Sequence, residues 1–167
     1  LDIWTYSCRN CLRSLPAIEA LYQKYKPFGL TVIGIHSPEF AFERDESNVA
    51  DAVARLGITF PVVLDPDFKI WDLYSNKHWP HSFVIDHNGI ITFDHVGEGG
   101  LHDLEQEIQL SLQAVGAKNL PAVANKINEH GEMCYRASQP MHLGYLRGQI
   151  GNAGDILPET EEAFTDD

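Results

Sequence analysis

The chain has 167 residues, of which 44% are hydrophobic, so it is long enough and apolar enough for one folded domain with a sizeable core. Its 24 acidic residues outnumber 12 basic ones and give a formal net charge of −12, which argues against binding nucleic acid through its phosphates. The sequence contains no apolar run of roughly 18 residues, so it predicts no membrane span.

The first residues, Leu1-Asp2-Ile3-Trp4, predict a buried strand over residues 1–5. This opening resembles the middle of a strand, and it carries neither an initiator Met nor a visible signal peptide. We therefore expect the chain to be a fragment of a longer protein. Missing strand material and any targeting segment would then lie upstream of Leu1.

Apolar residues then recur at helical spacing over residues 9–26. Pro16 lies inside this stretch and predicts a kink, while Pro27 and Gly29 predict the end of the helix.

Strand and helix signals alternate from there to about residue 115. Asn88-Gly89 between two short runs is a strong hairpin signal, and Gly57 is placed to end a helix. The predicted strands cover residues 30–35, 61–64, 82–86 and 90–94, and the predicted helices cover residues 46–56, 67–74 and 101–115.

This alternation predicts an α/β fold with a mixed central sheet and helices on both faces. Beyond Val115 the period is lost, and Gly, Pro, Asn and acidic residues accumulate. We predict a domain over residues 1–115 that lacks N-terminal strand material. Residues 116–167 are predicted to be a C-terminal extension or linker that ends in an acidic tail.

Two cysteines, Cys8 and Cys11, carry the strongest chemical signal, because the first lies where a helix begins. A helix N-terminus has unpaired N–H groups and a partial positive charge, which lower the pKa of a cysteine from about 8.5 to ~3.5–7.5. Cys11 lies one turn further on, close enough to attack a mixed disulfide. The pair therefore predicts dithiol–disulfide exchange. Cys134 is distant in sequence and is interpreted as a semi-buried free thiol.

The surroundings of this pair resemble the active-site strand and kinked helix of the thioredoxin superfamily. An acid, Asp2, stands six residues before Cys8, Trp4 stands four before it, and Pro16 stands eight after it. The stretches Trp-Thr-Tyr-Ser-Cys, His-Ser-Pro-Glu-Phe and Gly-Glu-Gly-Gly are similar to TlpA-like and redoxin (AhpC/TSA) type oxidoreductases. They are most similar to the redoxin domain of DipZ-like cytochrome c biogenesis proteins. The resemblance covers about residues 1–115 and implies a thioredoxin-like fold.

The resemblance also implies roles for five residues. Cys8 would be the nucleophile and Cys11 the resolving thiol. Asp2 would be a buried carboxylate beneath the pair, whose pKa is raised by desolvation so that it accepts the Cys11 proton near neutral pH. Glu39 matches an acid that some TlpA-like proteins place near the cysteines. Pro80 matches the cis-proline beside the disulfide.

Two histidines close to this proline, His78 and His81, are expected near the sulfurs, where a protonated ring would stabilise a thiolate. Solvated loop histidines are the alternative. Arg9 is adjacent to Cys8 and could favour the thiolate in the same way. Trp79 occupies a position where relatives often carry a smaller residue, so the shape and polarity of the substrate groove stay open.

The function implied is that of a thiol–disulfide oxidoreductase, in the form of an extracytoplasmic disulfide reductase. Its partners would be protein disulfide substrates and a membrane-embedded electron donor, with no nucleic acid, and no cofactor or metal is expected. The expected location is periplasmic or otherwise extracytoplasmic, with tethering to the membrane through the missing N-terminal region.

Three other functions stay open. Thr5-x-x-Cys8 resembles the peroxiredoxin motif, although Leu1 replaces the proline expected before it, so a thiol peroxidase is one alternative. Cys8 and Cys11 with a histidine, such as those of His78-x-x-His81, could instead form a metal-binding module. A catalytically silent thioredoxin-like adaptor is the third, and the intact cysteine pair argues against it.

Overall fold

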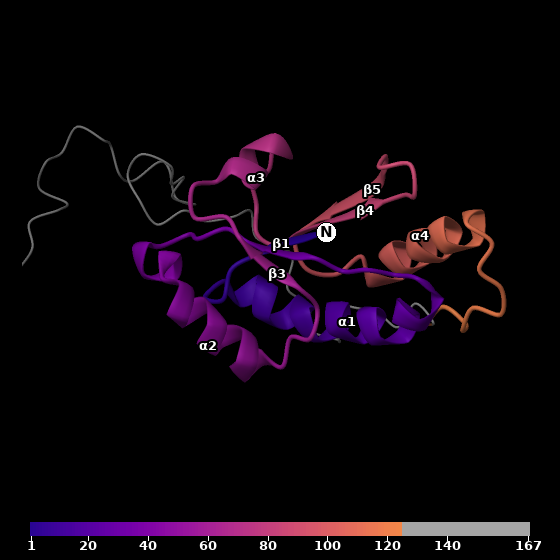
Figure 1. Ribbon diagram of the computed structural model, residues 1–167, viewed down its shortest axis with the longest axis horizontal. Coiled ribbons are helices and arrows are strands. Elements are labelled where there is room, and N and C mark those ends of the chain that lie inside the picture. Colours follow the sequence, from indigo (N-terminus) through magenta and orange to yellow (C-terminus); the bar gives the residue numbers. More distant parts are fainter. Residues whose placement is uncertain (125–167) are drawn as a thin grey trace, which may run out of the picture. The chain divides into compact units, whose positions relative to one another are not determined.

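The computed structural model describes residues 1–124; Cys134 and the predicted acidic tail lie outside the described residues. Its sheet has the strand order β3-β2-β1-β4-β5. The central strand β1 pairs in parallel with β2 and antiparallel with β4, which confirms the mixed sheet (Figure 1). The strands are β1 (Asp2–Trp4), β2 (Gly34–His36), β3 (Val62–Leu64), β4 (His81–Ile85) and β5 (Ile91–Val96).

Helices cover both faces of this sheet, as predicted. Figure 1 shows α3 on one side of the sheet and α1 on the other. The helices are α1 (Arg9–Tyr25), α2 (Glu46–Leu56), α3 (Lys69–Leu73) and α4 (Leu101–Ala114), with 3₁₀ turns η1 (Lys26–Phe28) and η2 (Ala41–Arg44). None of the helices within residues 1–124 is long and apolar enough to cross a membrane.

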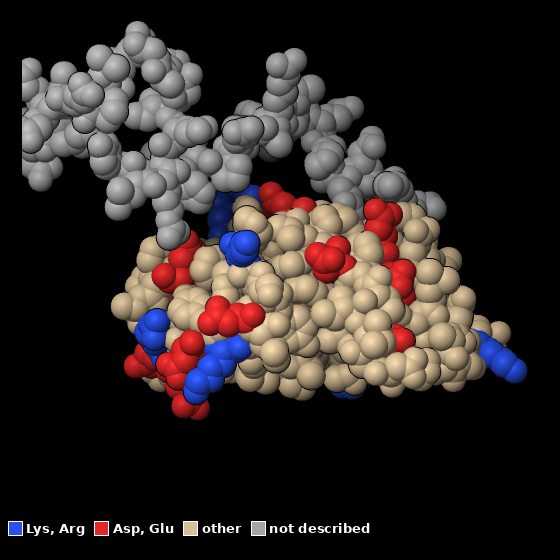
Figure 2. Space-filling view, turned by 90° about the horizontal axis from the view of Figure 1, so that it is seen from above, with Lys and Arg blue, Asp and Glu red and all other residues tan. Residues whose placement is uncertain are grey.

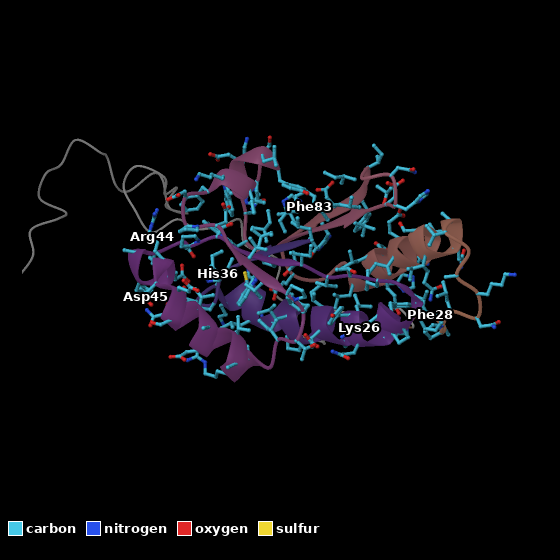
Figure 3. The ribbon with its side chains drawn as sticks, viewed as in Figure 1. Lys26, Phe28, His36, Arg44, Asp45 and Phe83 are labelled. Carbon is cyan, nitrogen blue, oxygen red and sulfur yellow. The ribbon has the colours of Figure 1, made fainter. Side chains whose placement is uncertain are left out.

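Two hydrophobic clusters follow from the alternation of side chains along β1. Trp4 points into the larger cluster, which is built mainly from α1 and α4. Ile3 points to the opposite face and packs with Phe83 and with the side chains of α3 (Figure 3). Burial of these two faces holds β1 at the centre of the sheet and fixes the direction in which the chain leaves it toward Cys8.

Two predicted elements are shorter than expected. Strand β2 begins at Gly34 rather than Leu30, because its ladder starts where Asp2 faces Gly34 and because the Leu30 N–H still donates to Tyr25 at the end of the preceding helix. Helix α3 begins at Lys69, because Phe68 adopts a left-handed conformation with φ of 59°.

Residues 116–124 form neither helix nor strand, and they pack on the domain. Ala117 and Leu120 contact the larger cluster, and the carbonyl of Pro121 accepts a hydrogen bond from the Gln109 amide. The Ala124 N–H donates to the buried carboxylate of Glu105 in α4. The remaining part of the predicted extension lies outside the described residues.

Gly34 leaves no room for a side chain where β2 crosses the larger cluster. A Cβ built there would come within 2.9 Å of both the Phe60 ring and the Trp4 indole nitrogen. We predict that Gly34→Ala lowers the free energy of unfolding by about 1–3 kcal/mol, measured by urea denaturation. Gly34 does not have a positive φ, so the loss comes from crowding alone; Gly89→Ala, at φ of 81° with nothing within 4 Å of its Cβ, measures backbone strain without crowding for comparison. A Gly34→Ala protein as stable as the parent would contradict the packing described.

Candidate active site

Cys8 is the N-cap of α1, so its side chain stands where the helix has unpaired backbone N–H groups. Its backbone is extended, and its Sγ accepts a hydrogen bond from the Cys11 N–H at 3.3 Å. Cys8 is half-buried, whereas Cys11 is buried in the larger cluster with 1% of its surface exposed. One thiol of the pair therefore faces outward and the other lies behind it.

The two thiols also differ in acidity, and the more exposed Cys8 is the more acidic of the two. The pKa of Cys8 is lowered to about 7, first by a hydrogen bond from the Cys11 thiol and then by the backbone N–H groups of Cys11 and Asn10. Burial and the charge of Glu39 oppose this shift. The pKa of Cys11 is raised, first by its hydrogen bond to Cys8, then by burial, with the charge of Asp2 adding to it. Cys8 is thus the thiol that ionises near neutral pH, while Cys11 keeps its proton.

Asp2 is a buried carboxylate at the start of β1, with 3% of its surface exposed. Its Oδ1 accepts a hydrogen bond from the Ser82 hydroxyl at 2.6 Å. Burial raises the pKa of Asp2 to about 6, against the opposing effect of the hydrogen bond from Ser82. Its charge acts on Cys11, and its pKa lies near neutrality, which are the properties that the expected role of proton acceptor requires.

Glu39 lies on the exposed side of the cysteine pair. Its charge raises the pKa of Cys8, and its own pKa is raised by partial burial and by the charge of Glu43. Arg13, which the sequence analysis did not single out, is a cation near Cys8. Arg13 donates to both carboxylate oxygens of Glu98 and is close enough to Cys8 to respond to its charge.

The Trp79–Pro80 peptide bond is cis, as the resemblance implied, and Pro80 is fully buried. Pairing of Ile3 with His81 places Pro80 across from Trp4, at the end of β1 from which the chain continues to Cys8. The Trp79 indole N–H donates to the Ser37 carbonyl at 2.9 Å, and its ring packs on Trp71 at 4.2 Å.

The expectation that His81 lies by the sulfurs is wrong. Its ring is buried between Asn76 Oδ1 at 2.6 Å and Asp94 Oδ2 at 2.9 Å, and it packs on Phe83 in the cluster next to α3. Side chains alternate along β4, so a residue that follows Pro80 turns to the face opposite the cysteines. His78 is exposed, as in the solvated-loop alternative.

Two buried polar residues near Cys8 were missed by the sequence analysis. His36 ends β2, and its Nε2 lies 3.2 Å from the Thr5 hydroxyl. Figure 3 shows His36 on the same side of the molecule as Arg44 and Asp45, away from Lys26 and Phe28. Glu43, in η2, accepts the Thr5 hydroxyl hydrogen at 2.5 Å. In sequence, Glu43 is one of several charges in a polar loop, and no spacing distinguishes it.

These contacts bear on the alternative functions. The Thr5 hydroxyl of the Thr-x-x-Cys motif is fully buried and donates to Glu43. Within residues 1–124 no group of three or more His, Cys, Asp or Glu side chains gathers in a way that could hold a metal ion. In this part of the chain the cysteine pair therefore has no further ligands for a metal.

Comparisons with known proteins show the family and the fold of the chain. Residues 1–94 match the model of the AhpC/TSA family. The chain is 46% identical over 99 residues to Protein DipZ of Mycobacterium bovis, a match that covers 59% of this chain and 14% of DipZ. It is 26% identical over 108 residues to thiol-disulfide oxidoreductase YkuV of Bacillus subtilis, covering 65% of this chain and 72% of YkuV. The solution structure of a thioredoxin-like protein in its oxidized form superposes with a TM-score of 0.60 at 26% identity, covering 68% of this chain and 77% of that one.

The raised pKa of Asp2 predicts that its carboxylate destabilises the fold at neutral pH. Since the folded-state pKa of about 6 exceeds the ordinary value of 3.8, the contribution of Asp2 to stability is fully present below pH 3.8 and is lost as pH rises through 6. We predict that Asp2→Asn raises the free energy of unfolding at pH 7 by about 1–3 kcal/mol and changes it little near pH 4, in urea denaturation at both values.

Asp51→Asn, on the exposed side of α2, is the matched control and should leave the stability unchanged at both pH values. A loss of stability in Asp2→Asn that is equal at pH 4 and pH 7 would refute the shift.

Proposed function

Because the chain belongs to the AhpC/TSA family, we propose that it is a thiol–disulfide oxidoreductase that reduces disulfide bonds of other proteins. The observation that carries the proposal is the division between a half-exposed, acidified Cys8 at the helix cap and a buried, protonated Cys11 behind it. A peroxidase needs one such thiol, whereas two thiols in this order serve a two-step exchange. The name of YkuV supports the same activity.

The first step is the attack of the Cys8 thiolate on a substrate disulfide. A bond forms between Cys8 Sγ and one substrate sulfur while the substrate S–S bond breaks. The departing substrate thiolate takes a proton from solvent. This step uses the lowered pKa of Cys8, since the thiolate and not the thiol is the nucleophile. The half-buried position of Cys8 lets the substrate sulfur approach from the exposed side.

The second step belongs to Cys11. Once Cys8 is in a mixed disulfide, its charge no longer disfavours the Cys11 thiolate, and Cys11 passes its proton to Asp2. Cys11 Sγ then attacks Cys8 Sγ and releases the second substrate thiolate. Two electrons have moved to the substrate, and Cys8 and Cys11 are joined by a disulfide. A dithiol donor must reduce this disulfide before the next cycle.

The setting we propose is extracytoplasmic, with protein disulfides as substrates and a membrane-embedded dithiol donor. Support comes from the similarity to DipZ, although the chain spans only 14% of that relative. The acidic balance of the chain argues against nucleic acid as a partner. On the face drawn in Figure 2, Lys and Arg side chains lie apart from one another among acidic and uncharged residues.

We predict that Cys11→Ser accumulates a mixed disulfide with a protein substrate, because the first attack proceeds and the second cannot. Cys8→Ser should trap little, since Cys11 is buried and holds its proton. The measurement is a non-reducing gel after mixing each reduced variant with oxidised insulin as the probe disulfide. The unsubstituted chain, which releases its product, is the control. Equal trapping by the two variants, or rapid turnover of hydrogen peroxide without disulfide reduction, would refute the proposal.

A further inference from the structure

Glu43 is a buried carboxylate that the mechanism above does not use. It has 1% of its surface exposed and accepts hydrogen bonds from five donors in two segments. Oε1 receives the Thr5 hydroxyl at 2.5 Å, the Ser7 hydroxyl at 2.6 Å and the Ser7 N–H at 3.1 Å. Oε2 receives the backbone N–H groups of Glu39 at 2.6 Å and Phe40 at 2.9 Å.

These donors explain how a charge is kept in the interior without a cation. Within residues 1–124 no Lys or Arg forms an ion pair with Glu43. Burial alone would raise the pKa of Glu43, but the hydrogen bonds from Ser7, Thr5, Phe40 and Glu39 together lower it below its ordinary value. Glu43 is therefore ionised at neutral pH, and each of its oxygens is an acceptor only.

The two segments joined by Glu43 meet at the reactive cysteine. Thr5 and Ser7 belong to the turn that leads from β1 to Cys8, and Ser7 directly precedes the helix cap. Glu39 and Phe40 enter η2, and Glu39 is the carboxylate whose charge acts on Cys8. The Glu43 carboxylate thus holds the backbone just before Cys8 and also the backbone of Glu39, the acidic residue that acts on Cys8.

We propose that Glu43 is a positioning residue for Cys8, which locks the turn before the helix cap so that Cys8 Sγ faces the N–H groups of α1. The inference rests on the proposed function, because it concerns the same thiol. It adds a residue that touches neither sulfur and acts through Ser7 and Thr5. When the hydrogen bonds of Glu43 are lost, we expect the turn before Cys8 to move and the hydrogen bond from the Cys11 N–H to Cys8 Sγ to break.

The test is Glu43→Gln, which keeps the volume of the side chain and replaces one acceptor oxygen by an NH₂ donor. Whichever oxygen is replaced, at least two of the five donors lose their acceptor. We expect the pKa of Cys8 to rise by roughly half to one unit, so that alkylation at pH 7 slows about two- to fivefold. The measurement is the rate at which iodoacetamide alkylates the reduced protein, followed as a function of pH. The titratable and charged groups that act on Cys8 are Cys11, Glu39 and Arg13.

Glu105→Gln is the matched control. Glu105 is also a buried carboxylate, with 3% exposed, and it is held by Lys24, the Tyr25 hydroxyl and the Ala124 N–H, away from the cysteines. Its substitution should cost stability and leave the pH profile of Cys8 unchanged. An unchanged profile in Glu43→Gln, or an equal shift in both variants, would overturn the inference.

If Glu43→Gln does not fold, Ser7→Ala is the second test. It removes the Ser7 hydroxyl, which donates to Glu43 at 2.6 Å, and keeps the hydrogen bond from the Ser7 backbone N–H. The pKa of Cys8 should rise in Ser7→Ala as well, by less than in Glu43→Gln, and an unchanged pKa would count against the inference. Insulin reduction by the unsubstituted chain is measured alongside. If the unsubstituted chain does not reduce insulin but the alkylation profile of Cys8 still shifts in Glu43→Gln, the proposed function is refuted and the inference about Glu43 stands.

Discussion

The active site depends on the way β1 delivers the chain to the start of α1. This strand is held on both sides, by β2 and by β4, and on both faces, by Trp4 in one cluster and Ile3 in the other. Four residues after Trp4, Cys8 caps the helix, and its Sγ accepts a hydrogen bond from one of the free N–H groups there. The hydrogen bond from the Cys11 thiol, the N–H groups at the helix cap and the burial of Cys11 together separate the two thiols in acidity. The chemistry of the pair therefore follows from the place where β1 ends and α1 begins.

Two buried carboxylates on either side of this turn show how the number of hydrogen-bond donors sets acidity. Asp2 accepts a side-chain hydrogen bond from Ser82, and burial raises its pKa to about 6. Glu43 is as deeply buried but receives five donors, and its pKa is lowered. The first can therefore exchange a proton near neutral pH, whereas the second keeps its charge and holds backbone in place. Their similar burial does not make them similar in function.

Much of the fold could be predicted from the sequence because its signals are local. The period of residues 46–56 and the following Gly57 predict α2 with the observed ends, and the Asn88-Gly89 turn predicts the hairpin of β4 and β5. Helix α3 was predicted too long, since the left-handed Phe68 has no sequence signal of the kind that Gly gives. The resemblance supplied the cis bond before Pro80. The role of Glu43 and the position of His81 depend on contacts between segments that are distant in sequence, so residue spacing could not predict either of them.

The central claim is that Cys8, which receives hydrogen bonds from the Cys11 thiol and from the N–H groups of the helix cap, is the thiol that ionises first. A titration of both cysteines tests it directly. The reduced chain, labelled with ¹³C at the cysteine Cβ atoms, would be followed by NMR as pH is raised. The account predicts that the Cys8 signal titrates near pH 7 and that the Cys11 signal does not move until well above the ordinary pKa of a thiol. Titration of Cys11 before Cys8, or of both together at the value of an unperturbed cysteine, would contradict it.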